Sequence, residues 1–354
     1  MNLFAVIMAG GVGSRFWPKS REKQPKQLIN IFGNNTMIQA TAGRLNGLVQ
    51  NENIYVITNK VQKDEIIKQL PQIPKGNIIA EPFGKNTAAA IGLASLIINQ
   101  KDKDSITVVL PADHLINDIQ NFQATIKYAS NFINEKEGLI TFGIVPTRPE
   151  TGYGYIQIDE QVEESEIFKV KTFAEKPNYA TAVRFLESGD FYWNSGMFIW
   201  KTKTILDEIK NLMPELDDGL NLLSKAIGSK NFDKILTHVY GQLKSISIDY
   251  GVMEKSKLVY LMKSSFDWSD VGSWEEVYLK TDKNENEMVE LGDIFSIKSK
   301  GCYISSQKFT ALVGVQNLIL IETDDSILVC DRSNAQDVKL VVDYLKLNKR
   351  ADLL

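Results

Sequence analysis

Short apolar runs that alternate with segments of helical spacing are the feature that most constrains the fold of this chain. The runs are rich in branched residues and read LFAVIMA, NIYVIT, NIIAE, SITVVLP and GLITFGIV. Between them, apolar residues recur at helical spacing in the stretch 37–48 and in NTAAAIGLASLIINQ, where we expect Asn86 to cap the helix. This alternation predicts an α/β fold with a mostly parallel sheet covered by helices on both faces.

The pattern changes twice along the 354 residues, a length that suggests two or three domains. From about residue 151, strand-like and helical segments are mixed, which indicates an α+β lobe that continues the same domain. From about residue 288, short strand-like pieces are separated by glycine or polar turns, and a helix is expected near AQDVKLVVDYLKL. We therefore predict a first domain over 1–287, with halves of about 1–150 and 151–287, and a small β-rich domain over 288–354.

Composition and charge narrow the class of protein. A hydrophobic fraction of 44% and a charged fraction of 24% are those of an ordinary globular protein. The net charge of −4 argues against a general nucleic-acid binder, which needs a broad basic surface. No apolar run approaches the length of a bilayer span, and Cys302 and Cys330 lie far apart without metal-ligand spacing. We expect a cytoplasmic protein with no membrane or nucleic-acid partner.

Three segments that follow predicted strands are candidates for chemistry, because ligands of such sheets sit beyond the carboxyl ends of the strands. They are the stretch 9–26, the motif EPFGKNT over 81–87 and the motif PADH over 111–114. The first reads AGGVGSRFWPKSREKQPK and combines three glycines with five basic residues, which are Arg15, Lys19, Arg21, Lys23 and Lys26.

Two familiar phosphate-binding motifs are excluded for this first segment. Phe16 stands where the dinucleotide fingerprint needs its third glycine, and the Gly-Lys-Ser/Thr ending of a P-loop is missing. What remains is a physical argument: glycines let backbone amides approach a phosphate, and the basic side chains supply charged contacts. The alternative interpretation is a glycine turn with a solvated basic face.

Eight motifs, taken together and in order, identify the chain as a member of a known family. They are GGVGSRFWPKSREKQPKQL, EPFGKNTAAAI, LPADH, GYGYI, FAEKP, WNSGMF, SIDYGVMEK and WSDVGSW, and they span Gly10 to Trp274. The set resembles the sugar-nucleotide pyrophosphorylases, and specifically the mannose-1-phosphate guanylyltransferases. Three positions depart from the usual pattern: Lys85 and Ala89 stand where Arg and Pro are common, and Gly251 where Ala is usual.

The resemblance implies a Rossmann-like, GT-A-like nucleotidyltransferase fold with a C-terminal unit like a left-handed β-helix. It also implies an enzyme that transfers GMP from GTP to mannose 1-phosphate, giving GDP-mannose and pyrophosphate. By the same resemblance, Arg15 and Lys26 are the catalytic residues that neutralise the triphosphate. The nucleotide-binding residues that it implies are Ala9, Gly10, Gly11, Gly13, Glu81, Pro82, Asn86, Thr87 and Asp113.

A metal ion and a sugar site follow from the same comparison of motifs. Asp113 and Asp270 match the family's ligands for Mg²⁺, an ion that prefers oxygen ligands. Taken alone, each would more simply be a residue of a turn or helix cap. The expected sugar-binding residues are Gly152, Tyr153, Gly154, Glu175, Lys176, Asn194 and Asp249, each of which could instead serve local structure.

Other functions stay open at this level. A related pyrophosphorylase would use another nucleotide or sugar, such as UTP or glucose 1-phosphate. A non-catalytic sensor of sugar nucleotides is disfavoured by the presence of Arg15, Lys26, Asp113 and Asp270, and a nicotinamide dehydrogenase by the incomplete glycine fingerprint. The β-rich C-terminal unit suggests a homodimer.

Overall fold

The computed structural model of the chain describes residues 2–11, 13–162 and 165–354, which form two compact units. Unit 1 comprises Met1–Gly10, Thr41–Ala112 and Ile116–Trp268, and unit 2 comprises Gly11–Ala40, Asp113–Leu115 and Ser269–Leu354. The chain therefore leaves unit 1 directly after the first predicted strand and again after the fourth. The predicted division at residue 287 stays a prediction.

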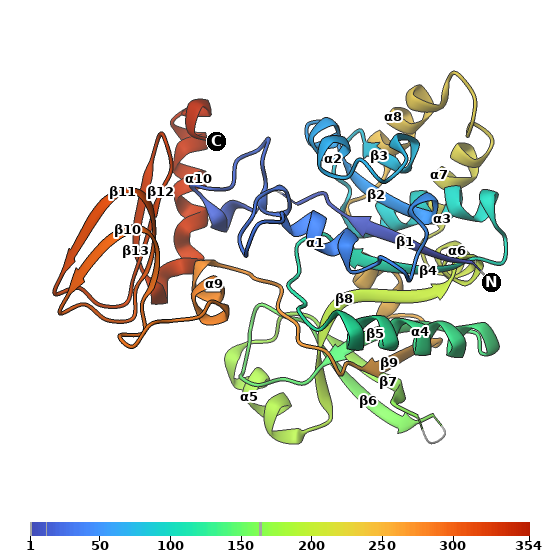
Figure 1. Cartoon of the computed structure of the whole chain (residues 1–354). Coiled ribbons are helices and arrows are strands. Elements are labelled where there is room, and N and C mark those ends of the chain that lie inside the picture. The colour runs from blue at the N-terminus through green and yellow to red at the C-terminus, as the bar shows by residue number, and fades with distance from the viewer. Residues whose placement is uncertain (1, 12, 163–164) are drawn as a thin grey trace. The chain divides into compact units, whose positions relative to one another are not determined.

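Unit 1 is built on a nine-stranded sheet with the order β3-β2-β1-β4-β8-β5-β9-β7-β6 (Figure 1). All of its strands run in one direction except β7 and β8. The strands are β1 (Leu3–Met8), β2 (Ile54–Asn59), β3 (Ile78–Glu81), β4 (Ile106–Pro111), β5 (Leu139–Ile144), β6 (Tyr155–Gln161), β7 (Ile167–Ala174), β8 (Phe191–Lys201) and β9 (Val259–Lys263).

Helices cover both faces of this sheet, as the continuous apolar runs predict. Phe4 and Val6 of β1 pack in one core with α3, and the alternating Ala5 and Ile7 are equally buried. The helices of unit 1 are α2 (Lys63–Gln69), α3 (Asn86–Lys101), α4 (Ile119–Glu135), α5 (Tyr179–Ser188), α6 (Thr202–Leu212), α7 (Pro214–Ser224) and α8 (Phe232–Gln242), with α1 (Met37–Gly43) at the boundary of the units. None of the helices in the described ranges is long and apolar enough to cross a membrane.

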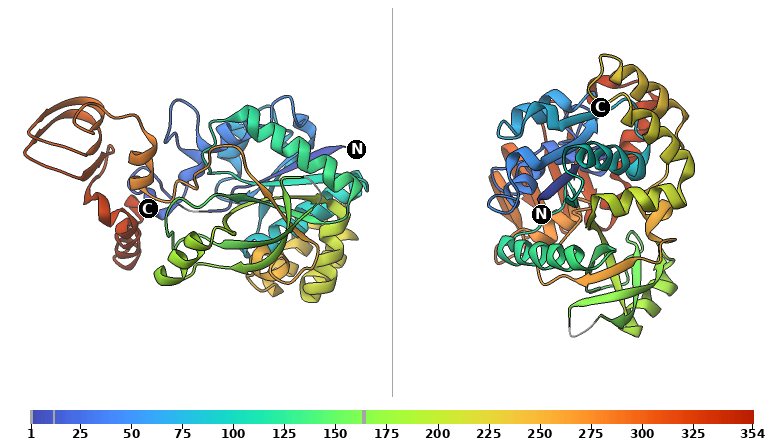
Figure 2. Two further views of the ribbon diagram at one scale, coloured as in Figure 1. Left: turned by 90° about the horizontal axis from the view of Figure 1, so that it is seen from below. Right: turned by 90° about the vertical axis from the view of Figure 1, so that its right-hand side faces the viewer.

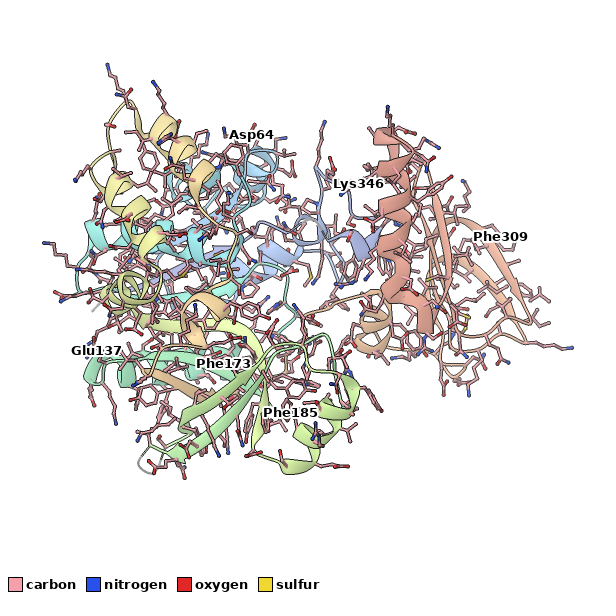
Figure 3. The ribbon with its side chains drawn as sticks, turned by 180° about the vertical axis from the view of Figure 1, so that it is seen from behind. Asp64, Glu137, Phe173, Phe185, Phe309 and Lys346 are labelled. Carbon is pink, nitrogen blue, oxygen red and sulfur yellow. The ribbon has the colours of Figure 1, made fainter. Side chains whose placement is uncertain are left out.

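One feature of the sequence is realised differently from its prediction. Asn86 does not cap α3 from outside: it is the first helical residue, with a positive φ of 64°, and its side-chain oxygen accepts from the amide of Thr87. The strands after residue 151 extend the same sheet. Phe185 of α5 (Figure 3) packs against Phe191, with ring centroids 3.8 Å apart. The predicted α/β class is confirmed.

Unit 2 contains a second sheet of four strands, β10 (Val289–Ile297), β11 (Tyr303–Val313), β12 (Leu318–Glu322) and β13 (Ile327–Asp331). β10, β11 and β12 pair in parallel and β13 returns antiparallel. Helix α9 (Trp274–Lys280) and helix α10 (Val338–Leu347) complete the unit (Figures 1 and 2). Val338, Val342 and Leu345 of α10 pack into the core of the unit. Phe16 and Trp17 of the glycine-rich segment belong to that same core.

Candidate active site

A cavity of about 270 Å³ in unit 2 collects residues from three distant segments of the sequence. We call it the phosphate cavity. Its walls contain both predicted catalytic residues and both predicted metal ligands. The lining residues are Gly13, Ser14, Arg15, Phe16, Lys26, Asp113, His114, Asp270, Val271 and Gly272.

Lys26 is the central cation of this cavity, and it is only 4% exposed. Its ammonium donates to Oδ2 of Asp113 at 3.0 Å and to the backbone carbonyl of Asp270, and it lies 5.4 Å from the centroid of the Phe16 ring. A buried ammonium is costly unless it is paired, and this one is held by a carboxylate and a carbonyl. Its position is therefore fixed before any ligand arrives.

The glycine-rich segment folds around Lys26. Gly13 has a positive φ of 61°, and a Cβ atom there would lie 2.6 Å from Cβ of Lys26 and 2.9 Å from its backbone nitrogen. The carbonyl of Gly13 accepts from the Ser20 hydroxyl at 2.7 Å, and that of Gly11 accepts from the Gln27 amide at 2.8 Å. Gly13 is thus required by its backbone conformation and by the close approach of Lys26.

We expect Gly13→Ala to lower the free energy of unfolding by about 1–3 kcal/mol, because it combines a strained φ with a steric clash. Urea unfolding measures this loss. Gly11→Ala is the matched control, since a Cβ there meets no described atom within 4 Å. Equal stability of the two variants would show that the packing of Gly13 on Lys26 is not a constraint.

Asp113 follows β4 and faces Lys26. Partial burial acts to raise the pKa of its carboxyl, but the charges of Lys26 and His114 outweigh this and hold that pKa below its usual value. The carboxylate is therefore ionised at neutral pH. Such a group is suited to bind a cation.

The Asp270 segment carries a strained backbone. Val271 has a positive φ of 47°, a conformation that β-branched residues rarely adopt, and its amide donates to Oγ of Ser269 at 3.1 Å. The strained residue, Val271, directly follows Asp270, whose backbone carbonyl accepts a hydrogen bond from Lys26. Strain of this kind is concentrated at functional sites, which supports a functional role for this turn.

The other basic residues of the segment do not line the phosphate cavity. Arg21 binds the carbonyl of Leu353 and the carboxylate of Asp325, the latter at 2.6 Å, and Lys19 lies 5.9 Å from the centroid of the Trp274 ring. Arg21 and Lys19 therefore contact other parts of unit 2, and an expected contact between these basic side chains and a phosphate stays a prediction.

Six of the predicted nucleotide-binding residues lie in unit 1, at or after the ends of β1 and β3: Ala9, Gly10, Glu81, Pro82, Asn86 and Thr87. Gly10 follows β1, and a Cβ added at Gly10 would meet no described atom within 4 Å. Thr87 uses its hydroxyl to accept from the amide of Ile248 at 2.8 Å. Ala9 and Glu81 are buried, and Pro82 is half-buried. The amide of Ala9 donates to the carbonyl of Ile57.

Glu81 is a buried carboxylic acid at the end of β3. It is 8% exposed, and burial raises its pKa to about 7, although the hydroxyl of Tyr240 acts in the opposite direction. Its atom Oε1 is shielded from solvent. A direct contact between Glu81 and a nucleobase stays a prediction.

Five of the predicted sugar-binding residues meet in unit 1, and we call them the sugar group: Gly154, Glu175, Lys176, Asn194 and Asp249. Asn194 donates to Oδ1 of Asp249 at 2.8 Å, and Lys176 pairs with Glu175 at 3.1 Å. A Cβ on Gly154 would lie 2.5 Å from Oε2 of Glu175 and 3.4 Å from Cβ of Asn194. The sequence motifs therefore converge on one cluster of polar side chains.

The backbone and charge of this group are unusual. Asp249 begins a π-helical turn over Asp249–Met253, and Lys176 has a positive φ of 47°. Burial raises the pKa of Asp249 despite the amide of Asn194, and the nearby carboxylate of Glu175 adds to the shift. The group combines two half-buried acids with an exposed cation.

Tyr153 and Gly152 make contacts outside the sugar group, and their predicted role in sugar binding stays a prediction. The ring of Tyr153 packs edge-on against Trp193 and Trp268, with centroids 5.1 and 5.5 Å away. The amide of Gly152 donates to Oε1 of Glu150 at 2.9 Å. Trp193, Trp200 and Trp274 are buried.

Comparison with known proteins assigns the family. The family model described as nucleotidyl transferase matches residues 4–287. A mannose-1-phosphate guanylyltransferase from Klebsiella pneumoniae is 41% identical over 99% of this chain and 75% of its own length, and one from Salmonella muenchen is 43% identical over 99% and 74%. The chain belongs to the mannose-1-phosphate guanylyltransferases, within the nucleotidyl transferase family.

The fold of this guanylyltransferase is also matched by a solved structure. The crystal structure of mannose-1-phosphate geranyltransferase from Thermus thermophilus has a TM-score of 0.89 and 31% identity, and the match covers 98% of this chain and 100% of that one. A second family model, described as a MannoseP isomerase/GMP-like beta-helix domain, matches residues 292–345. The predicted family, fold class and enzyme class are confirmed.

Sequence reasoning missed several residues of the guanylyltransferase site. Ser20 and Gln27 hold the glycine segment by hydrogen bonds, and Val271 holds the strained turn after Asp270. None belongs to a periodic pattern, because their roles depend on contacts between distant segments. The one available signal was that each stands inside a motif or beside a predicted site residue.

The raised pKa of Glu81 predicts a pH dependence of stability. Between pH 4.5 and about 7 the folded protein holds a proton that the unfolded chain releases, so stability should fall as the pH rises through this window. Glu81→Gln should remove up to about 1.4 kcal/mol per pH unit of that dependence. Urea unfolding of both proteins at pH 5 and pH 8 measures it, and parallel pH profiles would contradict the assignment.

Proposed function

We propose that the chain catalyses attack of an oxygen of mannose 1-phosphate on the α-phosphorus of GTP, releasing pyrophosphate and forming GDP-mannose. The observation that carries this proposal is the phosphate cavity, where Lys26 and Arg15 lie with two aspartates. The attack forms one P–O bond as the bond to pyrophosphate breaks. Two anionic reactants must be held in line, so positioning and charge neutralisation are the main contributions of the protein.

The nucleophile needs no protein base. The second pKa of a phosphate monoester is about 6, so mannose 1-phosphate is largely a dianion at neutral pH. The sequence contains only two histidines, His114 and His238, and His114 lines the cavity. We propose that His114 acts on Asp113, whose pKa it helps to lower, and that it does not transfer a proton.

Arg15 and Lys26 have complementary roles in this proposal. Lys26 is buried and pre-positioned, so it neutralises charge that develops on the phosphoryl group without reorganisation. Arg15 is exposed and makes no hydrogen bond or ion pair with another described residue, so its guanidinium is available to the triphosphate. Gly10 and Gly11 leave space for backbone amides to approach a phosphate.

Asp113 and Asp270 are the proposed ligands of Mg²⁺. Both line the phosphate cavity, and carboxylate oxygens are the hard donors that this ion prefers. In the described part of the chain, no cluster of three or more His, Cys, Asp or Glu side chains could bind a metal alone. Two carboxylates fit an ion that completes its shell with substrate phosphates and water, and the bound ion would offset negative charge on those phosphates.

The sugar group is proposed to select mannose 1-phosphate, with Glu175 and Asp249 accepting from sugar hydroxyls and Lys176 meeting the phosphate. We expect Asp249→Asn to raise KM for mannose 1-phosphate about 10- to 100-fold, because a hydrogen bond to a charged group contributes about 1.5–3 kcal/mol. KM for GTP should stay unchanged. Initial-rate kinetics with each substrate varied in turn measure this, and an equal rise in both constants would contradict the assignment.

One assay tests the proposed reaction against its rivals. Release of pyrophosphate is measured for GTP and UTP, each combined with mannose 1-phosphate or glucose 1-phosphate. We expect turnover to be greatest with GTP and mannose 1-phosphate. Equal rates with GTP and UTP would overturn the guanylyl preference, and binding of GDP-mannose without turnover of any pair would favour the sensor.

We also infer that the active form is a homodimer. Apolar side chains on alternate positions of the β10–β13 sheet are exposed, and Phe309 is one of them (Figure 3). The others are Leu291, Phe295, Ile297, Val313, Ile327 and Val329. An exposed apolar patch of this kind fits a second copy of the chain. A monomer mass by light scattering that does not depend on concentration would contradict the inference.

A further inference from the structure

A second cavity, of about 190 Å³, lies in unit 1 and shares no residue with the groups described above. Its walls come from the start of α3, the corner between α6 and α7, and the segments on either side of Asp249. We call it the α3 pocket. Its lining residues are Ala88, Ala89, Leu212, Met213, Pro214, Glu215, Leu216, Leu243, Lys244, Ile246, Gly251 and Lys255.

All three positions at which the motifs depart from their usual residues meet at this pocket. Ala89 and Gly251 line it, and Lys85 donates to the carbonyl of Leu243, another lining residue. Both lining positions carry a smaller residue than the usual Pro and Ala. A Cβ on Gly251 would clash with Sδ of Met213, so glycine at this position lets the Met213 side chain pack directly against the backbone in the wall of the pocket.

The chemistry of the lining defines the class of ligand. Aliphatic side chains form most of the surface, and an apolar cavity of about 150 Å³ is already large enough to take up benzene. Three charged residues line it, and two of these, Lys244 and Glu215, pair with each other at 2.7 Å. The third, Lys255, has no carboxylate partner within the described lining, and its charge acts on the neighbouring Glu254, which lies outside the lining.

The pocket is connected to the predicted nucleotide residues by hydrogen bonds and to the sugar group along the chain. The amide of Ala88 donates to the carbonyl of Ile246, and the amide of Ile248 donates to Oγ1 of Thr87, a predicted nucleotide residue. Gly251 follows Asp249 of the sugar group within the same π-helical turn. A ligand that packs against this wall would restrict the segment that carries Asp249 and supports Thr87.

We propose that the α3 pocket binds a small molecule with a short apolar chain or ring and one carboxylate, and that its occupation strengthens the binding of GTP. The apolar part fills the space beside Ala89, Met213 and Leu216, and the carboxylate pairs with Lys255. Because binding free energies are linked, GTP strengthens the binding of this ligand by the same factor.

Hexanoate is the probe, and hexan-1-ol is its neutral counterpart. In protein labelled with ¹³C at the methionine methyl groups, hexanoate should shift the Met213 methyl signal in a saturable way, with Met213→Leu assigning that signal. Hexan-1-ol should bind at least about tenfold more weakly, a difference of about 1.4 kcal/mol. No saturable shift with hexanoate would overturn the site, and equal binding of the alcohol would overturn the carboxylate assignment.

Variants test the location. Ala89→Leu fills the pocket and Lys255→Met removes its cation, so each should weaken hexanoate binding at least about tenfold. Lys257→Met is the matched control, because Lys257 is exposed and outside the lining, and it should bind as the unmodified protein does. Should Ala89→Leu fail to fold, Gly251→Ala tests the same space. Unchanged binding in a folded pocket-filling variant would overturn the location.

The link to GTP is measured by equilibrium binding without turnover, so its outcome does not depend on the proposed reaction. Saturating hexanoate should lower Kd for GTP by about fivefold, the lower end of typical coupling. The same addition should leave Kd unchanged in Lys255→Met. An unchanged Kd for GTP in the unmodified protein would overturn the coupling.

Discussion

Replacing Lys26 by alanine is expected to lower kcat by about 100- to 1,000-fold, the usual effect of removing one pre-positioned donor from an enclosed anionic site. Lys26 is 4% exposed, and its ammonium is held by Asp113 and Asp270. We therefore expect it to act on the phosphoryl group without first losing a water shell. Single-turnover measurement of pyrophosphate release at saturating GTP and mannose 1-phosphate isolates this step.

Lys23→Ala is the control for this experiment. Lys23 belongs to the same basic segment but is exposed and does not line the phosphate cavity, so its loss should change kcat little. Urea unfolding of Lys26→Ala separates catalysis from folding, since removal of the buried ammonium also affects Asp113. A folded Lys26→Ala enzyme with the kcat of the unmodified chain would exclude Lys26 from catalysis.

The second large effect is expected from Asp113→Asn and Asp270→Asn. Each should raise the Mg²⁺ concentration for half-maximal activity by at least about 100-fold, because even a partner that only orients a metal ligand contributes about 10- to 100-fold to affinity. An amide keeps the shape of the side chain but loses its negative charge. Activity is measured as a function of Mg²⁺ concentration at fixed GTP.

Asp104→Asn is the control for these two variants, since Asp104 is exposed and lies outside the phosphate cavity. Its Mg²⁺ dependence should equal that of the unmodified enzyme. If either Asp113→Asn or Asp270→Asn keeps the original Mg²⁺ dependence, that residue does not bind the metal.

Much of the fold could be predicted because its signals are local. The runs LFAVIMA and SITVVLP are continuous because β1 and β4 are buried on both faces, and this pattern indicates a covered sheet from sequence alone. The cap of α3 was predicted wrongly. Asn86 favours a cap by its residue type, but the chain enters the helix through Asn86 itself in a left-handed conformation.

The family motifs predicted more residues of the candidate site than the periodicity of apolar residues could. They named the sugar-group residues, which are scattered from Gly154 to Asp249, and the structure brings these together within unit 1. They did not separate residues that face a cavity from residues that pack. Tyr153 and Arg21 belong to motifs but contact aromatic rings or the C-terminal segment.

By itself the sequence determined the class of fold and the family and predicted the charged residues of the site, because strand burial and short motifs are properties of neighbouring residues. Only the tertiary structure decided that Gly11–Ala40, Asp113–Leu115 and Ser269–Leu354 form one compact unit, in which Lys26 meets Asp113 and Asp270. That arrangement depends on packing between segments far apart in the chain, where Phe16 and Trp17 share a core with Trp274 and α10. Nothing in the local sequence specifies such a contact, because its free energy comes from surfaces that meet only after folding.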